Sequence, residues 1–496
     1  MKRVVSAQEM RAYEQIRFSD GRADSLDWME RAAEGVDALL NAQYRNQSVL
    51  CVCGTGNNGG DGFALLRLLT QRGISCAGVL LGDQDKLSGD AKANYLRAID
   101  CGVVFYDALN SERLQCYDVL VDAMFGTGLS RPLTGIYADA VQRMNATKKP
   151  IVAVDLPSGV GATSGAILGC AIQASETVSF EFYKRGHLLF PGRGLCGEVI
   201  VHPLSHEQDL EIGTVNLFTR EDAARLLPKR PANSHKGRNG RALLCVGSER
   251  YVGAALLSVG AALSAGAGLT TAAVPGRVKP AFSALPEAMC APVNDGADWD
   301  FAACENTIAL LPQKNAVCIG SGVGDGDILP LIEAALNSKL PLVLDADALN
   351  QLSQKPEMLQ LLHNNAILTP HPAEMARLCG ESIEAILQDP IEIARRYAKQ
   401  WNCVVLLKGA TSCISNGTEV RLNISGNAGL AKGGSGDVLS GLITGLLAQG
   451  LSAFDAASCG AFLLGASADT ALELVKERML LARDVISALE QTIQGI

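Results

Sequence analysis

Short apolar runs alternate with longer segments of helical spacing along the first half of the chain. Apolar residues fill 48–53, 76–81, 118–122 and 151–155, and later 176–183 and 198–201. Between them, helical spacing of apolar positions occupies 6–20, 26–44, 63–69 and 88–100. This alternation is typical of a parallel sheet with helices on both faces. We therefore predict an α/β fold with a Rossmann-like parallel sheet in this half.

The second half repeats the alternation after a segment rich in proline and polar residues, 203–240. The strand-like runs are 241–246, 269–274, 316–319, 342–345, 367–369 and 404–407, and the helical patterns are 253–268, 438–447, 453–476 and 482–492. We place the boundary near residue 215, because each part is then long enough to bury its own core. The prediction is two domains, 1–215 and 220–496.

Composition and charge narrow the class of protein. The chain has 496 residues, 48% of them hydrophobic, and a net charge of −9. Such acidity argues against a nucleic-acid partner held through phosphates, so an anionic ligand must be held by local loops. The 15 cysteines are scattered without a CxxC pair, which predicts reduced thiols and a cytoplasmic location. No apolar stretch is long enough to predict a membrane span, and the first five residues do not form a signal peptide.

Three polar loops follow strands of the first half. They are 54–62 (GTGNNGGDG), 126–132 (GTGLSRP) and 155–159 (DLPSG). Ligands of parallel sheets bind at the carboxyl ends of strands, so we expect these loops to form one site. Gly54, Gly56 and Gly59 also match GxGxxG, and Asp83 lies where a dinucleotide fold places its ribose acid. That match is weak alone, and an ordinary dehydrogenase lacks an evident hydride-transfer site here.

Hard oxygen ligands stand at three of these strand ends. Asn58, Asp122 and Ser158 suit a monovalent or divalent cation. The alternative is an Asx turn at Asn58 and a helix cap at Asp122. Further along, the basic residues Lys184, Arg185 and His187 are interpreted as a solvated loop. The alternative is that they lie near the mouth of a ligand site.

The three loop motifs, in this order, make the first 215 residues resemble the YjeF N-terminal domain, an NAD(P)HX epimerase. The resemblance implies that Asn58, Asp122 and Ser158 bind K⁺. It implies further that the hydrated dinucleotide is held by Asn57, Asn58, Gly59, Gly60, Asp61, Gly126, Thr127, Gly128, Leu129, Ser130, Arg131, Pro132 and Asp155. We expect Asp155 to be the acid/base group at the nicotinamide carbon.

The most distinctive stretch of the second half is the glycine-rich segment 426–441. Gly433, Gly434, Ser435 and Gly436 are followed by Asp437 and then by an apolar helical pattern. Backbone N–H groups at such a helix start attract phosphate, whereas a carboxylate repels it. Asp437 makes sense there as the base that deprotonates a hydroxyl attacking the phosphate. The alternative is a helix cap.

The motifs G-S-G-V-G (320–324), D-A-D-A-L (345–349), T-P-H-P-A-E (369–374), K-G-A-T (408–411) and G-G-S-G-D (433–437) resemble the ribokinase-like superfamily. More narrowly they resemble ADP-dependent (S)-NAD(P)H-hydrate dehydratases, over 220–496, which implies a ribokinase-like α/β sandwich. The resemblance implies that Ala254, Gly322, His371 and Asp437 line the hydrated nicotinamide. ADP, with Mg²⁺, would be held by Lys408, Gly409, Ala410, Thr411, Ser412 and Gly436. Lys432 could touch a phosphate or point to solvent.

Together the resemblances predict a repair enzyme for hydrated nicotinamide cofactors. One domain would interconvert (R)- and (S)-NAD(P)HX, and the other would convert (S)-NADHX or (S)-NADPHX to NAD(P)H while ADP becomes AMP and phosphate. A homo-oligomer, a tetramer or octamer, is expected. The alternative is a hydroxymethylpyrimidine- or sugar-type kinase fused to a non-catalytic nucleotide-binding module.

Overall fold

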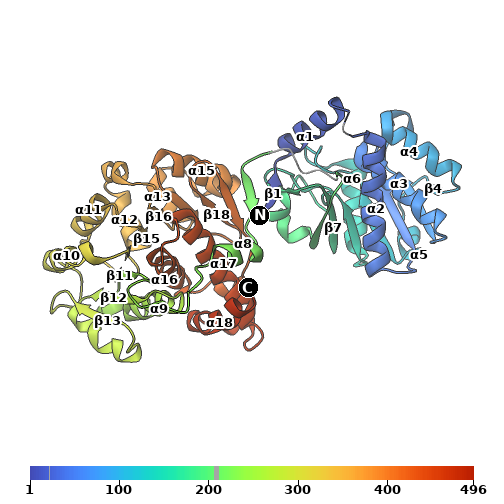
Figure 1. The fold of residues 1–496 in the computed structure, drawn as a ribbon. Coiled ribbons are helices and arrows are strands. Elements are labelled where there is room, and N and C mark those ends of the chain that lie inside the picture. The colour runs from blue at the N-terminus through green and yellow to red at the C-terminus, as the bar shows by residue number, and fades with distance from the viewer. Residues whose placement is uncertain (22, 206–211) are drawn as a thin grey trace. The chain divides into compact units, whose positions relative to one another are not determined.

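The computed structural model describes residues 1–21, 23–205 and 212–496. The chain divides into two compact units, Lys2–Gly213 and Thr214–Ile496 (Figure 1). The predicted linker begins at residue 203, and its residues 206–211 lie outside the described part. Each unit has hydrophobic clusters of its own.

The first unit contains a parallel seven-stranded sheet in the order β4-β3-β2-β5-β6-β7-β9. Its strands are β2 (Val49–Cys53), β3 (Cys76–Leu80), β4 (Val104–Tyr106), β5 (Val119–Ala123), β6 (Ile151–Val154), β7 (Glu176–Phe180) and β9 (Glu198–His202). Every residue of β2 and β5 is buried. Strands covered on both faces read as continuous apolar runs, which is why the sequence predicted them.

Helices cover both faces of this sheet (Figure 1). They are α1 (Ala7–Ser19), α2 (Ser25–Gln43), α3 (Asn57–Gln71), α4 (Gly89–Asp100), α5 (Ser111–Cys116), α6 (Gly135–Ala146) and α7 (Arg185–Leu188). Ser6 and Glu9 form a capping box that starts α1, and Asp24 caps α2 as predicted. The parallel α/β prediction is therefore confirmed for this unit.

A short parallel pair positions one basic residue of this unit. β1 (Lys2–Val5) pairs with β8 (Tyr183–Lys184), and Val5 lies opposite Lys184. The segment interpreted as a solvated loop is thus partly a strand, followed by α7 and the 3₁₀ turn η2 (Gly192–Leu195).

The second unit contains a mixed sheet in the order β13-β12-β11-β14-β15-β16-β17-β18-β19-β10. The strands are β10 (Val215–Leu217), β11 (Arg241–Cys245), β12 (Leu269–Val274), β13 (Met289–Pro292), β14 (Ala316–Ile319), β15 (Leu342–Leu344), β16 (Ala366–Leu368), β17 (Val404–Leu407), β18 (Ser412–Ser415) and β19 (Val420–Asn423). Only the β17-β18-β19 meander is antiparallel among the pairings described. The sequence pattern did not predict β18 or β19.

The helices of the second unit include the predicted glycine-led helix, α16. They are α8 (Arg220–Leu226), α9 (Val252–Ser264), α10 (Phe301–Ile308), α11 (Leu329–Ser338), α12 (Asp347–Ser353), α13 (Pro372–Cys379), α14 (Ile383–Gln388), α15 (Pro390–Gln400), α16 (Ser435–Ala448), α17 (Ala453–Ala471) and α18 (Ala482–Gln494). The prediction that α17 reaches Lys476 is wrong. The amides of Leu474 and Val475 both bond to Ala471 O, and the helix ends in a tightened turn.

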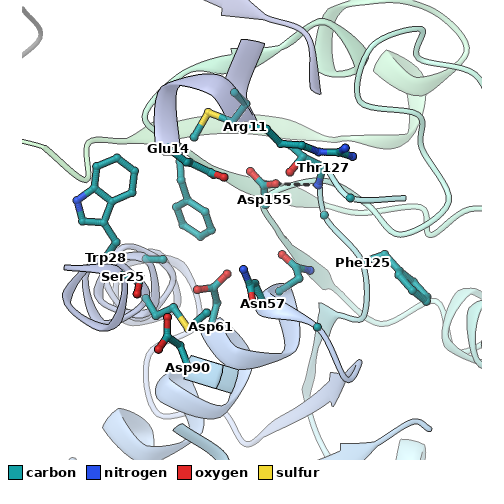
Figure 2. A pocket seen from close by; sticks show the side chains of 18 of the residues that line it. Arg11, Glu14, Ser25, Trp28, Asn57, Asp61, Asp90, Phe125, Thr127 and Asp155 are labelled. Atoms are coloured by element: carbon teal, nitrogen blue, oxygen red, sulfur yellow. Dashed lines mark hydrogen bonds between the residues drawn. The ribbon is translucent and has the colours of Figure 1, made fainter. Parts of the chain in front are cut away.

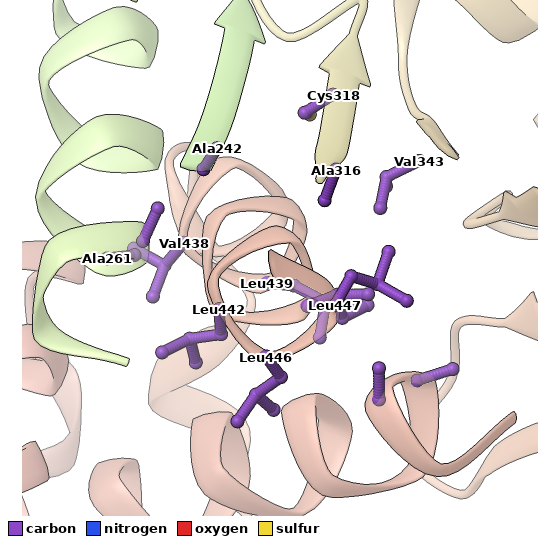
Figure 3. Packing of buried hydrophobic residues seen from close by; sticks show 14 of the residues in the cluster. Ala242, Ala261, Ala316, Cys318, Val343, Val438, Leu439, Leu442, Leu446 and Leu447 are labelled. Carbon is purple, nitrogen blue, oxygen red and sulfur yellow. The ribbon is translucent and has the colours of Figure 1, made fainter. Parts of the chain in front are cut away.

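Helix α16 lies in the core of this unit. Figure 3 shows Val438, Leu439, Leu442 and Leu446 among side chains from β11, β14 and α9. Glycine allows the close approach of α9: a Cβ on Gly441 would lie 2.1 Å from Ser258 O. The packing fixes the start of α16, where Asp437 lies.

Candidate active sites

A cavity of about 580 Å³ lies beside the carboxyl ends of β2, β5 and β6 (Figure 2). Helices α1 and α2 also line it. Eight of the predicted site residues line this cavity: Asn57, Asn58, Asp61, Gly126, Thr127, Gly128, Leu129 and Asp155. The three loops therefore do meet at one place, as the positions of parallel strand ends require.

The other predicted binding residues of this unit lie outside the cavity lining: Gly59, Gly60, Ser130, Arg131 and Pro132. Gly59 and Gly60 have packing roles that explain their presence. A Cβ on Gly59 would lie 1.9 Å from Gly54 O, and one on Gly60 would lie 2.9 Å from Met29 Sδ. These glycines let α3 begin directly against the loop and α2.

Asp155 is held in place from several sides. Its backbone is left-handed, with φ +63°, a conformation that costs energy for a residue with a Cβ. Its Oδ1 lies 2.6 Å from Lys184 Nζ, and Thr127 N donates to Oδ2 at 3.2 Å. His187 Nε2 lies 2.8 Å from Asp155 O. The carboxylate is thus fixed at the cavity wall.

The interpretation of Lys184, Arg185 and His187 as solvated is wrong, since all three are buried. Lys184 Nζ donates to Ser179 Oγ at 3.0 Å and to Phe180 O at 2.8 Å, besides its ion pair with Asp155. Burial lowers the pKa of His187 to about 4, so this ring is neutral. A buried lysine needs this full set of partners, and sequence pattern alone does not reveal partners.

Two further carboxyl groups point into the cavity near Asp155: Glu14 and Asp61 (Figure 2). Burial, then the charge of Asp155, raises the pKa of Glu14 to about 7. The same causes raise the pKa of Asp61 well above its usual value. Glu14 was missed at the sequence level. One sequence feature could have indicated Glu14. It is a carboxylate four residues from both Met10 and Phe18, so it lies on the apolar face of α1, and these two residues also line the cavity.

The three predicted cation ligands lie close to this wall. Ser158 N and Oγ donate to Asp122 Oδ2 and Oδ1, both at 2.7 Å, and Phe125 N donates to Ser158 Oγ at 2.9 Å. Burial raises the pKa of Asp122 to about 6. A Cβ on Gly126 would lie 2.9 Å from Asn58 Oδ1 and 2.8 Å from Asp155 Oδ2. Gly126 thus lies between the ends of these two side chains.

In the second unit, Asp437 lies in the first turn of α16. Gly434 precedes that helix with φ +99°, and no side chain caps the helix start. The structure therefore gives no support to the helix-cap alternative. Burial, then the charge of Asp345, raises the pKa of Asp437 to about 6. A carboxyl group so tuned can accept and return a proton near neutral pH.

A buried network lies beside Asp437. Lys408 Nζ lies 3.0 Å from Asp345 Oδ1 and 3.6 Å from Glu374 Oε2. Although burial lowers it, the pKa of Lys408 is raised overall by these two carboxylates. Thr369 Oγ1 donates to Asp345 Oδ1 at 2.8 Å. A Cβ on Gly436 would lie 3.7 Å from Lys408 Nζ, so the glycine loop and this network share one place.

His371 begins α13 rather than standing free. Its Nδ1 accepts hydrogen bonds from Ala373 N at 3.1 Å and Glu374 N at 3.3 Å. The ring is about half exposed, with Nε2 3.4 Å from Glu374 Oε1. Burial of its inner part lowers the pKa of His371. A capping imidazole with an exposed edge can still contact a ligand through that edge.

The predicted nucleotide-binding residues of the second unit line a cavity only in part, and the predicted nicotinamide-binding residues line neither of two cavities in this unit. Lys408, Gly409, Ser412 and Gly436 line a cavity of about 180 Å³, whereas Ala410 and Thr411 do not. Ala254 lies against Gly322, where a Cβ would come within 2.6 Å of Ala254 Cβ. A cavity of about 410 Å³ nearby is lined by Ser248, Tyr251 and Gly324 among others, but not by Ala254, Gly322, His371 or Asp437.

Lys432 does not reach the glycine loop. Its Nζ donates to Arg478 O and Leu480 O, both at 2.7 Å. This lysine therefore holds a neighbouring turn at the exposed surface, which agrees with the solvent alternative.

Comparison with known proteins assigns the family. A model described as NAD(P)H-hydrate dehydratase matches residues 242–491, and one described as YjeF-related protein N-terminus matches 25–186. A bifunctional NAD(P)H-hydrate repair enzyme from Moorella thermoacetica is 36% identical over 99% of this chain and 97% of its own length. The chain belongs to this family of bifunctional NAD(P)H-hydrate repair enzymes. The Escherichia coli member is 33% identical over 94% of this chain and 89% of its own.

Solved structures of repair-enzyme relatives agree with the second unit's fold. The ADP/ATP-dependent NAD(P)H-hydrate dehydratase from Bacillus subtilis, co-crystallised with ATP and Mg²⁺, is 30% identical. It covers 57% of this chain and 98% of its own, with a TM-score of 0.51. This likeness confirms the ribokinase-like fold class. Among the described residues, no helix is long and apolar enough to cross a membrane.

Proposed function

We propose that this chain repairs hydrated nicotinamide cofactors through two activities. The first domain, 1–215, interconverts (R)- and (S)-NAD(P)HX, and the second, 220–496, dehydrates (S)-NAD(P)HX with ADP. The observation that carries the proposal is Asp437, a proton-exchanging carboxyl group at a glycine-rich helix start in a chain of this family. The closest alternative chemistry at such a loop is a kinase that keeps its phosphorylated product.

Asp437 supplies the base for the dehydration. It takes the proton of the 6-hydroxyl group as that oxygen attacks the terminal phosphorus of the nucleotide. The N–H groups of Gly434, Ser435 and Gly436, at the start of α16, stabilise the charge that develops. The N1 lone pair then expels phosphate as the C6–O bond breaks, and C5 gives up a proton to solvent, so the electron pair of its C–H bond forms the C5=C6 double bond and N1 regains its lone pair. The nucleotide leaves one phosphate shorter.

The nucleotide would lie along Lys408, Gly409, Ser412 and Gly436, which line one cavity. Support for nucleotide and Mg²⁺ comes from the Bacillus subtilis dehydratase, co-crystallised with both. Mg²⁺ would neutralise phosphate charge when bound. Among residues 1–21, 23–205 and 212–496, no group of three or more His, Cys, Asp or Glu side chains is placed to hold a metal ion.

The oxygen ligands for K⁺ in the first domain would be Asn58, Asp122 and Ser158. The residues fit this ion: all three offer hard oxygen atoms, and Asp122 is a buried carboxyl group that accepts hydrogen bonds from Ser158 and Met124 N. Asn58 Nδ2 is buried without a hydrogen-bond partner in the described structure, so this side chain is not committed elsewhere. K⁺ would supply positive charge that favours an ionised Asp122.

Asp155 acts as the acid/base group of the epimerase. Its carboxylate is fixed by Lys184 and Thr127 at the wall of the larger cavity. The substrates are NADHX and NADPHX, and no nucleic acid is involved. We propose a cytoplasmic homo-oligomer, a tetramer or octamer, as the working form.

Product analysis tests the dehydratase against the kinase alternative. Purified protein is mixed with (S)-NADHX, ADP and Mg²⁺, and nucleotides and hydrate are separated by chromatography. We expect NADH, AMP and phosphate in equal amounts. A stable phosphorylated hydrate, or nucleotide consumption without NADH, would support the kinase instead.

A further inference from the structure

Three of the carboxyl groups that line the cavity of the first unit lie near the fully buried Lys184, and Asp90 and Arg11 line the same cavity. Glu14 comes from α1, Asp61 from α3 and Asp155 from the loop after β6 (Figure 2). Lys184 pairs with Asp155 at 2.6 Å. Burial and the charge of Asp155 raise the pKa of Glu14 to about 7, although Lys184 and Arg11 both lower it, so the cavity favours a protonated carboxyl group at this position.

Glu14 differs from Asp155 in its partners. Asp155 is held by Lys184 and by Thr127 N. The carboxyl group of Glu14, by contrast, has no hydrogen bond or ion pair within the described part of the chain. Figure 2 shows it pointing toward Asp155 across the cavity. A half-buried carboxyl group without a structural partner is available to a bound ligand.

We propose that Glu14 is the second catalytic residue of the epimerase, the proton donor that works opposite the Asp155 base. This inference rests on the proposed epimerase function. Lys184 Nζ lies 2.6 Å from Asp155 Oδ1, whereas Glu14 has no cation at contact distance within the described part of the chain. The two carboxyl groups thus have different surroundings, one paired with a lysine and the other unpaired and raised in pKa, which suits the two members of an acid/base pair.

Opening and closing the hydrated ring would require one proton acceptor and one proton donor, the roles proposed for Asp155 and Glu14. C6 carries the hydroxyl group and is also bonded to N1. Asp155 takes the hydroxyl proton, the O–H electrons form the C6=O bond, and the C6–N1 bond breaks. Its electron pair goes to N1, which takes the proton of Glu14. After rotation about C5–C6 the reverse steps close the ring on the other face, so both residues regain their starting states and no oxidant is needed.

Glu14 suits this cycle better than Asp61. The groups that face Glu14 are Asp155, Lys184 and Arg11, with Asp61 beside it on α3. Burial and Asp155 together raise the pKa of Glu14 to about 7, near working pH. The pKa of Asp61 is raised well above its usual value by burial and by the charges of Asp155 and Glu14.

The test uses the full chain and resolved (R)-NADHX, with conversion to the (S) epimer followed by chiral chromatography from pH 5 to 9. For Glu14→Gln we expect kcat to fall roughly 10²–10⁴-fold with KM little changed. The wild-type rate falls above about pH 7 as Glu14 loses its proton, and the residual rate of Glu14→Gln lacks that fall. Glu14→Asp, which keeps an acid, should retain the fall at a reduced rate. Glu112→Gln, an exposed carboxyl group on α5, is the matched control.

Two results would overturn the inference while the epimerase stands: Glu14→Gln with wild-type kcat, or a slow Glu14→Gln that still loses rate above pH 7. If the wild-type chain itself does not interconvert the epimers, the proposed function fails first. Thermal unfolding of each variant checks that the proteins compared are folded. If Glu14→Gln does not fold, the pH profile of Glu14→Asp still tests the inference.

Discussion

At the scale of single residues, each site pairs a lysine with an aspartate. In the first unit Lys184 pairs directly with Asp155 and fixes the position of its side chain. In the second unit Lys408 pairs with Asp345 instead. Asp437 is left outside that pair, and the charge of Asp345 helps to raise its pKa. The second arrangement yields a carboxyl group that can exchange its proton near neutral pH.

This arrangement predicts how the dehydratase responds to pH. Asp437 must be ionised to act as a base, and its pKa is raised to about 6. We therefore expect kcat/KM for (S)-NADHX to rise between pH 5 and 7 with a midpoint near that value, and to level off above it. Replacement by Asn should lower kcat roughly 10²–10⁴-fold and remove the midpoint.

The control for this prediction is Asp139→Asn, which changes an exposed carboxyl group on α6. It should leave the pH profile in place. An Asp437→Asn protein that keeps the wild-type midpoint would mean that another group titrates in the reaction.

At the scale of elements, the sequence predicted most of the strands of both sheets and the glycine-led helix, because these depend on local apolar patterns. It did not predict the hairpin β18-β19, the helix α6 or the β1-β8 pair. Pairing between distant segments leaves no local pattern, since residues 2–5 and 183–184 are far apart in the chain. The burial of Lys184 follows from that pairing, so its place in the site could not be predicted either.

Some candidate site residues could likewise be predicted from local sequence, and others depend on contacts between distant segments. Loops that follow strands could be placed together, and Asn57, Asp61 and Asp155 do line one cavity. Whether a loop residue faces the cavity or packs behind it depends on contacts across the fold, and Gly59 and Gly60 pack. Glu14 belongs to a helix far from the loops in sequence, and only the folded chain brings it to them.

The contact between α9 and α16 gives a prediction about stability. Gly441→Ala places a Cβ 2.1 Å from Ser258 O, so the helices must move apart. The cost of such overpacking, about 1–3 kcal/mol, outweighs the helix propensity that alanine gains. We expect a lower midpoint in urea denaturation of the second unit.

Gly253→Ala is the matched control on α9, because a Cβ there meets nothing within 4 Å. That substitution should raise the free energy of unfolding by about 0.5–1 kcal/mol through helix propensity alone. Equal effects of the two substitutions would contradict the close packing of α9 on α16.

At the scale of the whole molecule, the chain joins two sites whose residues come from separate units, Lys2–Gly213 and Thr214–Ile496. A dehydratase that accepts only the (S) epimer would leave half of a mixed hydrate pool unrepaired. An epimerase in the same chain makes the whole pool available. Each activity should therefore be removable by itself, because Asp155 and Asp437 belong to separate units.

Recovery of NADH from an equal mixture of (R)- and (S)-NADHX, with ADP and Mg²⁺, tests this account most directly. The wild-type chain should restore the whole mixture. Gly126→Ala, which displaces the ends of Asn58 and Asp155, should restore only the (S) share, and Asp437→Asn should restore almost none. Full recovery by Asp437→Asn, or recovery of only the (S) share by the wild-type chain, would contradict the account.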